Sequence, residues 1–518
     1  MNKTLISTAT ITIGIVAVVF SASAAERAKP VRPNVVIIYA DDLGYGDLSC
    51  YNPEGKISTP NIDALAERGV RFTDAHSASS ISGPSRYSII TGQYSWRTDV
   101  KRGNPPSGKD LWVSPDRVTI ASLLDNEGYN TAAIGKWGLG ANYSAAARPG
   151  RTGYDFSPEA IDYSKPIPSA QAIGFDYEAL HRWFGTGGFR KVYTHTLCDG
   201  SEVKYSDGAR WYFENSMSRD GDPQFEKFDM EEAQIYYIDK AVEYINVASG
   251  RGRNKSFNLD RGKPFFLYYA PHIPHYPHVP SDQFEGKSEV GIYGDFIMQL
   301  DWAVGRIVEA LEERKQLDNT IIIFASDNGP EKQTYDYIEK YDHRSMGDFR
   351  GVKRDLYQGG HTTPLIVSYP QSSNRGRVSD RLISQSDIFA TLADLMDIEY
   401  DNQECAEDSF SFADEILDGY LVENRREIAI HHSSDGKLAL RSGDWVLINA
   451  TNGSSTLEPE WFRQSIGAEN LGLECELFNL RDDPQQTKNL VRDYPDKVSD
   501  LRAELKGYVS AGRTVFND

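Results

Sequence analysis

The chain has few cysteines, fewer basic than acidic residues and no long apolar run. Each of these shortages argues against a class of protein. Four cysteines in 518 residues exclude a disulfide-rich scaffold, and Cys405 with Cys475 is the pair we expect if one bond forms. Lys and Arg number 55 against 75 Asp and Glu, a net charge of −20, which argues against a nucleic-acid partner. Any anion site must therefore be a local cluster of cationic side chains.

The one sustained apolar run near the N-terminus, residues 11–20, is too short for a comfortable membrane span. Lys3 precedes it and the small residues 22–24 follow it, an order typical of a secretory signal peptide over residues 1–24. No cysteine lies near the cleavage point, so we expect no lipid anchor and no stable membrane anchor. The pattern predicts export to the periplasm or beyond.

Short apolar strands alternate with amphipathic helices through most of the chain. Strands are expected at 34–40, 130–134, 263–270 and 319–325, and helices at 59–68, 118–127 and 293–313. This alternation predicts an α/β fold with a large mixed, mostly parallel sheet flanked by helices, over residues 31–395. Residues 141–262 are expected to be an insertion that shapes substrate access, and 396–518 a smaller α+β domain with a closing helix at 495–508.

A Ser-Gly-Pro-Ser-Arg motif at 82–86 stands where a polar loop enters an apolar segment. A hydroxyl at a helix N-terminus meets unpaired N–H groups, Pro84 suits the first turn, and Arg86 adds a cation one turn later. These are the needs of a nucleophile that attacks a sulfate or phosphate ester. Alone, the motif also matches a capping serine followed by proline; the rest of the chain favours the nucleophile.

Acidic and amide side chains follow two predicted strands. Asp41 and Asp42 come after the first, and Asp327 and Asn328 after the last. With Ser82 they offer an all-oxygen shell, which suits Ca²⁺ or Mg²⁺ rather than Zn²⁺. The alternative is that both pairs only cap turns.

Three histidines alternate with prolines in one loop, at His272, His275 and His278. A polyproline helix would align the three imidazoles along one edge. They can form a metal cluster, or one of them can be a general acid beside polar neighbours, and we favour the acid because oxygen ligands already serve a metal. Lys136 and Lys353 follow strand-like or Gly-rich turns, where they can hold sulfate oxygens or remain ordinary surface lysines.

Taken in order, these motifs resemble those of the type I sulfatases, a formylglycine-dependent family of the alkaline phosphatase superfamily. The resemblance covers almost all of the mature chain. It is carried by ADDLGYG at 40–46, TPNID at 59–63, SGPSR at 82–86 followed by Thr91-Gly92, GKW at 135–137, YGD at 293–295 with Asp301, SDNG at 326–329, and ELFNL at 476–480 with Asp483-Pro484.

The resemblance implies that a serine-type sulfatase-maturing enzyme converts Ser82 to formylglycine. In such enzymes one hydroxyl of the hydrated aldehyde attacks sulfur, and a covalent sulfate ester forms as the alcohol leaves. The second hydroxyl is then deprotonated, and the aldehyde re-forms as sulfate is eliminated. The resemblance also assigns the remaining site: one Ca²⁺ on Asp41, Asp42, Asp327, Asn328 and the modified Ser82; Arg86 and Lys136 on the hydrate; Lys136 and Lys353 on sulfate; His275 as general acid; and His272 as a neighbouring substrate-binding group.

Three positions depart from the family pattern. Most members carry cysteine at the position of Ser82, and many carry histidine at the position of Gly138. Gln358-Gly-Gly-His361 replaces a commoner Glu-Gly-Gly-x-Arg pattern. The group that takes the proton from the second hydroxyl, and the outer part of the site, therefore do not follow from the resemblance.

The expected function is removal of sulfate from a sulfated glycan, a polysaccharide or its oligosaccharides. The glycan part depends on export and on a supply of 29 Tyr, 22 Phe and 8 Trp that can stack on sugar rings. One alternative is a phosphate or phosphonate ester hydrolase of the same superfamily. A two-zinc phosphatase of that superfamily needs several additional His and Asp ligands, whereas here Asp327 is followed by Asn328 rather than by histidine. Another is a non-catalytic glycan-binding relative in which Ser82 stays unmodified.

Overall fold

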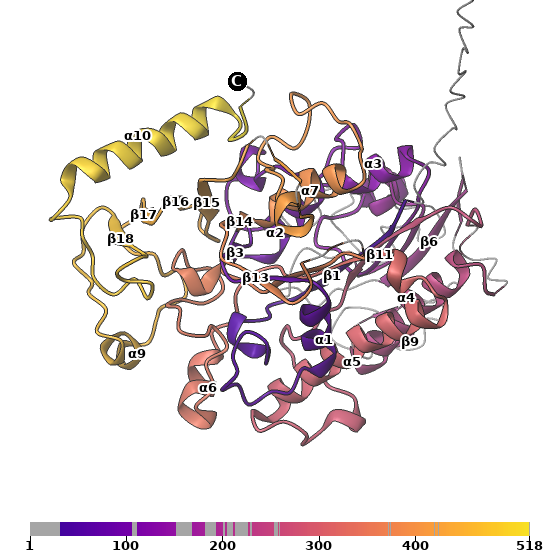
Figure 1. Cartoon of the computed structure of the whole chain (residues 1–518), viewed down its shortest axis with the longest axis horizontal. Coiled ribbons are helices and arrows are strands. Elements are labelled where there is room, and N and C mark those ends of the chain that lie inside the picture. Colours follow the sequence, from indigo (N-terminus) through magenta and orange to yellow (C-terminus); the bar gives the residue numbers. More distant parts are fainter. Residues whose placement is uncertain are drawn as a thin grey trace, which may run out of the picture. The chain divides into compact units, whose positions relative to one another are not determined.

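The computed structural model describes residues 32–516, apart from 106–110, 152–167, most of 182–229, 253–256 and positions 258, 371, 373, 419 and 423. The expected signal peptide at 1–24 and much of the expected insertion at 141–262 lie outside the described residues. Figure 1 shows a large central sheet with helices on both sides. None of the helices in the described part of the chain has the length and apolar character of a membrane span.

The sheet has ten strands and is parallel at its centre. Their order is β13 (Arg377–Ser379), β2 (Val70–Phe72), β12 (Leu365–Ser368), β11 (Thr320–Ser326), β1 (Asn34–Ala40), β10 (Phe265–Ala270), β4 (Asn130–Lys136), β5 (Tyr177–His181), β6 (Tyr193–Asp199) and β7 (Glu202–Lys204). The pairs from β11 through β5 are parallel, whereas β12, β6 and β7 pair antiparallel. The predicted mixed, mostly parallel sheet is confirmed.

The central strands are apolar along their whole length because both faces are covered. In β1 every residue is buried, and alternate side chains enter two different cores. Val35 and Ile37 face the core built with α2 (Ser82–Thr91), α3 (Ile120–Asn126) and α7 (Ile388–Leu395). Val36 and Ile38 face the core built with α1 (Pro60–Arg68), α4 (Met230–Ala248) and α5 (Gly291–Glu313).

A second, smaller antiparallel sheet follows in the C-terminal part. It has the order β15 (Ile428–His432), β16 (Leu438–Ser442), β17 (Trp445–Ile448) and β18 (Glu476–Asn479), and α10 (Pro495–Ala511) packs on it. The remaining elements are the short helices α6 (Thr334–Tyr341), α8 (Ala413–Ile416) and α9 (Glu460–Ser465) and the short strands β3 (Ala75–His76), β14 (Ile383–Ser384), β8 (Trp211–Tyr212) and β9 (Glu226–Lys227).

The expected pairing of Cys405 with Cys475 is wrong. Both thiols are free, because Cys405 is buried in the core beneath the large sheet while Cys475 is buried between the small sheet and α10. Met396, where we expected the smaller domain to begin, and Phe412, which falls within its expected range, also pack in the core of the large sheet.

Candidate active site

The carboxyl ends of β1 and β11 bring four oxygen-bearing side chains together. The two strands are parallel neighbours with Ala40 opposite Ser326, so the residues that follow them leave the sheet at one edge. The Asp42 backbone N–H donates to Asp327 Oδ1 at 3.1 Å. Asn328 Nδ2 donates to Asp42 Oδ1 at 2.8 Å. The predicted pairs thus form one cluster rather than two separate turns.

Ser82 is the first residue of α2 and lies directly against this cluster. Its Oγ is 3.3 Å from Asp41 Oδ1 and 3.2 Å from Asn328 Oδ1. A Cβ on Gly83 would approach Asn104 Oδ1 to 2.1 Å, so the absence of a side chain at Gly83 lets Asn104 pack against the first turn of α2. Asn104 was not singled out from the sequence, since nothing around it marks it as part of a site.

Three buried carboxylates, Asp41, Asp42 and Asp327, each offer an oxygen within 4.8 Å of the others. Burial, with the charges of Asp41 and Asp327, raises the pKa of Asp42 to about 6 although Lys353 lies against it. Such concentrated negative charge among all-oxygen donors fits a hard divalent cation. The carbonyl oxygen of Asn328 and the hydroxyl of Ser82 complete a donor set of that kind.

Three buried cations balance the three carboxylates. Lys136 Nζ lies 2.7 and 2.6 Å from the Asp41 oxygens, and Lys353 Nζ lies 2.7 Å from Asp42 Oδ2. Arg86 Nη2 donates to Asp327 Oδ2 at 2.7 Å. Burial opposes the charge on Asp41, but the neighbouring cations Lys136 and Arg86 outweigh it and lower its pKa.

Two tyrosines enclose the guanidinium of Arg86, which is wholly buried. Arg86 Nη1 is 3.5 Å from the Tyr268 hydroxyl, and the guanidinium carbon is 5.3 Å from the centre of the Tyr39 ring. Neither tyrosine was predicted from the sequence, because an aromatic residue inside an apolar strand is indistinguishable there from ordinary core. Together they fix the cation one turn above Ser82.

Two of the three loop histidines reach the site. His275 Nε2 is 3.5 Å from Asp42 Oδ2, His272 Nδ1 is 3.6 Å from Asp41 Oδ2, and their ring centres are 4.7 Å apart. The expectation of three imidazoles along one edge is wrong. The ring of His278 packs against Tyr293 and Tyr337, and burial lowers its pKa to about 4.

Gly138 follows the Gly-Lys-Trp motif in a backbone conformation that favours glycine over histidine. Its φ is +73°, which residues other than glycine rarely adopt, and a Cβ there would lie 3.1 Å from Cδ of Arg86. The backbone is folded so that Arg86 occupies the space beside it.

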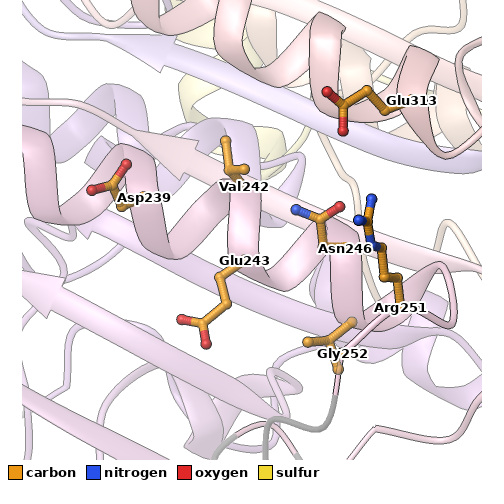
Figure 2. Close-up of a pocket in the computed structure, with 8 residues that line it drawn as sticks. Asp239, Val242, Glu243, Asn246, Arg251, Gly252 and Glu313 are labelled. Carbon is orange, nitrogen blue, oxygen red and sulfur yellow. The ribbon is translucent and has the colours of Figure 1, made fainter.

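A separate hollow of about 830 Å³ lies along α4 and holds none of these residues (Figure 2). Half of its lining residues are charged, namely Asp239, Glu243, Arg251 and Glu313. It contains no paired nucleophile and base, so its size does not make it a catalytic site.

Comparison with known proteins identifies the family of the chain. The family described as Sulfatase matches residues 33–398. The N-acetylgalactosamine-6-O-sulfatase of Bacteroides thetaiotaomicron is 32% identical over 511 residues, covering 92% of this chain and 93% of that protein. Human arylsulfatase A is 29% identical and covers 92% of this chain and 87% of its own length.

A solved structure has a similar fold. It is a Bacteroides thetaiotaomicron protein described in connection with the metabolism of multiple glycosaminoglycans, with a TM-score of 0.71 and 30% identity. The matched region covers 92% of this chain and 99% of the chain in that structure. With a buried serine, three carboxylates and three cations at one sheet edge, and a family match over most of its length, this chain belongs to the sulfatase family of the alkaline phosphatase superfamily and is a sulfatase.

Proposed function

We propose that this sulfatase removes sulfate from a sulfated glycan, with formylglycine made from Ser82 as its nucleophile and one Ca²⁺ per chain. The observation that carries the proposal is the position of Ser82 Oγ, within 3.3 Å of Asp41 and Asn328 at the start of α2. Formylglycine, formed by a serine-type maturing enzyme, supplies a hydrated aldehyde at that position. The S–O bond to the sugar breaks, and water and the ester become alcohol and sulfate.

The charge balance of the site favours an anionic ester only when the metal is bound. Arg86, Lys136 and Lys353 contribute three positive charges, and the three aspartates cancel them. Glu331, 3.9 Å from Lys353, is itself paired with Arg354. A calcium ion held by Asp41, Asp42, Asp327, Asn328 and residue 82 gives the site a net charge of about +2, which attracts a sulfate ester in a chain that is otherwise strongly acidic.

Lys136 and Lys353 are the groups we assign to the sulfate oxygens. Both ammonium groups are almost fully buried and sit on opposite members of the Asp41–Asp42 pair. With a calcium ion held by the same carboxylates, the two ammonium groups would have hydrogens to donate to the sulfate oxygens. Arg86, bound to Asp327, keeps the hydrate in place.

His275 is the group we assign to the leaving alcohol. Its Nδ1 lies 2.6 Å from the Tyr276 carbonyl oxygen, so that nitrogen carries a hydrogen and Nε2 faces Asp42. A proton on Nε2 then makes the ring cationic, which the Asp42 carboxylate stabilises before the proton is passed on. His272 lies beside it as a substrate-binding group.

The glycan substrate is supported by the relatives rather than by the site. The B. thetaiotaomicron relative is named for N-acetylgalactosamine 6-O-sulfate chemistry, and it matches this chain over nearly its whole length. The export expected from residues 1–24 would bring the enzyme to a substrate of this kind outside the cytoplasm.

The test is release of free sulfate from a panel of sulfated glycosaminoglycans, their oligosaccharides and a small aryl sulfate, with matched phosphate esters beside them. The enzyme is co-expressed with a serine-type maturing enzyme and assayed with Ca²⁺. We expect sulfate from at least one glycan, and a fall of about 10⁴-fold or more for Ser82→Ala. Ser85→Ala is the matched control, because its hydroxyl bonds the Ser79 carbonyl oxygen instead of the site.

Phosphate release at a higher rate than sulfate release would contradict the proposal and favour the phosphatase alternative. Unchanged sulfate release after complete calcium removal would contradict the role of the metal. Sulfate release confined to small aryl sulfates would leave the sulfatase chemistry intact but overturn the glycan assignment.

A further inference from the structure

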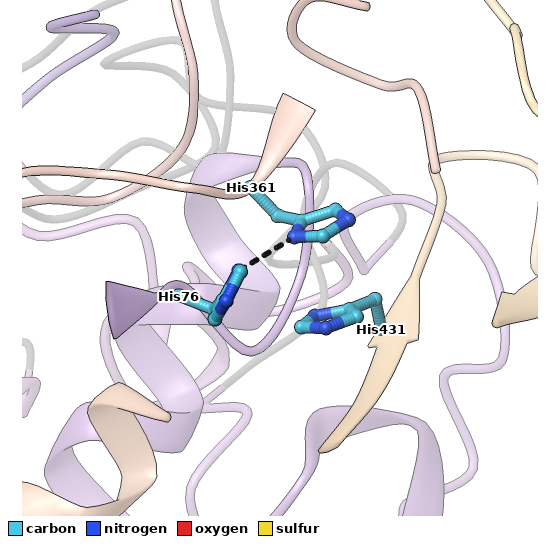
Figure 3. Close-up of side chains that lie close together, drawn as sticks. All are labelled: His76, His361 and His431. Atoms are coloured by element: carbon cyan, nitrogen blue, oxygen red, sulfur yellow. Dashed lines mark hydrogen bonds between the residues drawn. The ribbon is translucent and has the colours of Figure 1, made fainter. Parts of the chain in front are cut away.

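A second cluster of potential metal ligands lies outside the active site. His76 on β3, His361 after the turn at 358–360 and His431 on β15 each offer a ring nitrogen within 4.8 Å of the others, and all three side chains are buried. Figure 3 shows His431 projecting from its strand toward the other two rings. The proposed sulfatase reaction uses none of them.

The protonation of two of these rings is set by groups on their outer sides. His76 Nε2 lies 2.8 Å from Asp74 Oδ1, and His361 Nε2 lies 3.2 Å from the Leu356 carbonyl oxygen. Both acceptors require a hydrogen on Nε2, which leaves Nδ1 of each neutral ring with a bare lone pair. Yet the two Nδ1 atoms face each other at 3.1 Å. Two lone pairs at that distance need either a proton or a cation between them.

The guanidinium nearest to these rings does not leave an unbalanced positive charge that would repel a metal ion. Arg441 Nη1 is 3.3 Å from His76 Nε2, but it also pairs with Asp74, which neutralises its charge.

His431 is buried, and neither of its ring nitrogens makes a hydrogen bond of normal geometry, although a backbone group of Ser77 lies near the ring. The ring stacks on that of His361, with centres 3.7 Å apart and planes inclined by 10°. Poorly paired polar atoms in a buried position cost free energy unless something else binds them.

We propose that His76, His361 and His431 bind one Zn²⁺ that fastens the small C-terminal sheet to the large domain. Zinc–imidazole bonds of 2.0–2.1 Å place tetrahedral ligands about 3.3 Å apart, close to the 3.1 Å between the two Nδ1 atoms. Zinc lies in the plane of each imidazole that binds it, so the His431 ring has to turn out of its stack on His361 and close a gap of at most about 1.5 Å. The hydroxyl of Thr362, 3.3 Å from His76 Nδ1, offers a fourth donor.

The backbone already holds the three segments together. His76 pairs with Thr362, the Ser77 N–H donates to the His361 carbonyl oxygen at 2.8 Å, and Ser79 pairs with His432 beside the third ligand. The segments that carry the ligands are thus held together before the metal arrives, and Asp74 orients His76 as second-layer carboxylates do in zinc sites. Imidazole donors without carboxylate ligands select zinc over calcium, so the two metals do not compete for one site.

The experiment measures zinc and calcium per chain in the purified enzyme kept in excess Ca²⁺. We expect one zinc, its removal by a zinc-selective chelator, and a fall of about 3–5 °C in the unfolding temperature that added Zn²⁺ reverses. His431→Phe keeps the ring stacking but removes both nitrogens, so it should lose the zinc while calcium stays bound. His432→Gln is the matched control, because its ring bonds the Lys101 carbonyl oxygen instead.

A purely structural histidine cluster predicts the opposite, since His431→Phe would then leave the unfolding temperature unchanged or raise it. Absence of zinc from the wild-type enzyme, with no effect of added Zn²⁺, would overturn the proposal. Equal loss of zinc in His432→Gln would also overturn it. If His431→Phe does not fold, titration of Co²⁺ into the zinc-depleted wild type decides, because an intense visible spectrum requires a tetrahedral site and its absence refutes one.

Discussion

At the scale of single residues, the site works through charges that have been taken out of water. Each of the three aspartates has a cationic partner within 2.7 Å. A buried charge without its partner costs free energy, because water no longer solvates it. Substitution of one residue of an ion pair therefore also leaves the charge of its partner unpaired. Activity and stability have to be measured together.

Lys353→Met is the first test at this scale. It removes the cation assigned to sulfate, and we expect kcat/KM for sulfate release to fall by about 10²- to 10³-fold. Lys332→Met, at an exposed neighbouring position, should change neither kinetics nor unfolding. Full activity of Lys353→Met at saturating calcium would show that this ammonium group does not touch the ester.

Glu331 provides a test by pH. Burial raises its pKa, but the two bonds from Arg354 and the charge of Lys353 outweigh burial and bring it to about 2, below the ordinary 4.5. A lowered folded-state pKa stabilises the protein above about pH 4.5, and the stabilisation is lost as the pH falls toward about 2.

Glu331→Gln should therefore reduce the free energy of unfolding by about 1–2 kcal/mol at pH 6, and by progressively less below about pH 4.5. Urea unfolding of both proteins between pH 3 and 6 measures the difference. The exposed Glu339→Gln on α6 should show no such trend. A difference that grows as the pH falls would contradict the sign.

At the scale of elements, the site depends on a turn after β4 that only glycine fits. Gly138→Ala introduces the strain of φ +73° and a Cβ 3.1 Å from Arg86 Cδ, whereas Gly443→Ala introduces strain at φ +57° with nothing within 4 Å. We expect both to cost about 1 kcal/mol of stability. Only Gly138→Ala should lower kcat/KM, by about 10- to 100-fold, because Arg86 must shift. Equal activity of the two variants would disprove the contact.

The elements nearest the site were the easiest to predict from sequence. The predicted strand at 34–40 and the end of the helix at Arg68 are confirmed to the residue, because β-branched runs and a stopping glycine are local signals. The antiparallel neighbours β12 and β2 were not predicted, since strands of three or four residues carry little periodicity. The role of Tyr268 was not predicted, and the position of His278 was predicted wrongly, because their neighbours come from other segments of the chain.

At the scale of the whole molecule, buried ion pairs join the C-terminal part to the large domain. Arg426 Nε bonds Asp387 at 2.7 Å, and the same guanidinium donates to the carbonyl oxygens of Asp408 and Ile428. Arg426→Met should cost about 3–5 kcal/mol, because it leaves Asp387 charged and buried. Arg425→Met, whose side chain is 62% exposed beside Asp414, should cost less than about 1 kcal/mol. Similar losses in chemical unfolding would contradict this account of the junction.

The central claim is that residue 82 acts as formylglycine, and mass spectrometry of the peptide that contains it tests this most directly. In active enzyme isolated after co-expression with a serine-type maturing enzyme, we predict that this peptide is two hydrogens lighter than its sequence requires. Sulfate release should rise in proportion to the modified fraction. Fully active enzyme in which Ser82 is entirely unmodified would contradict the account.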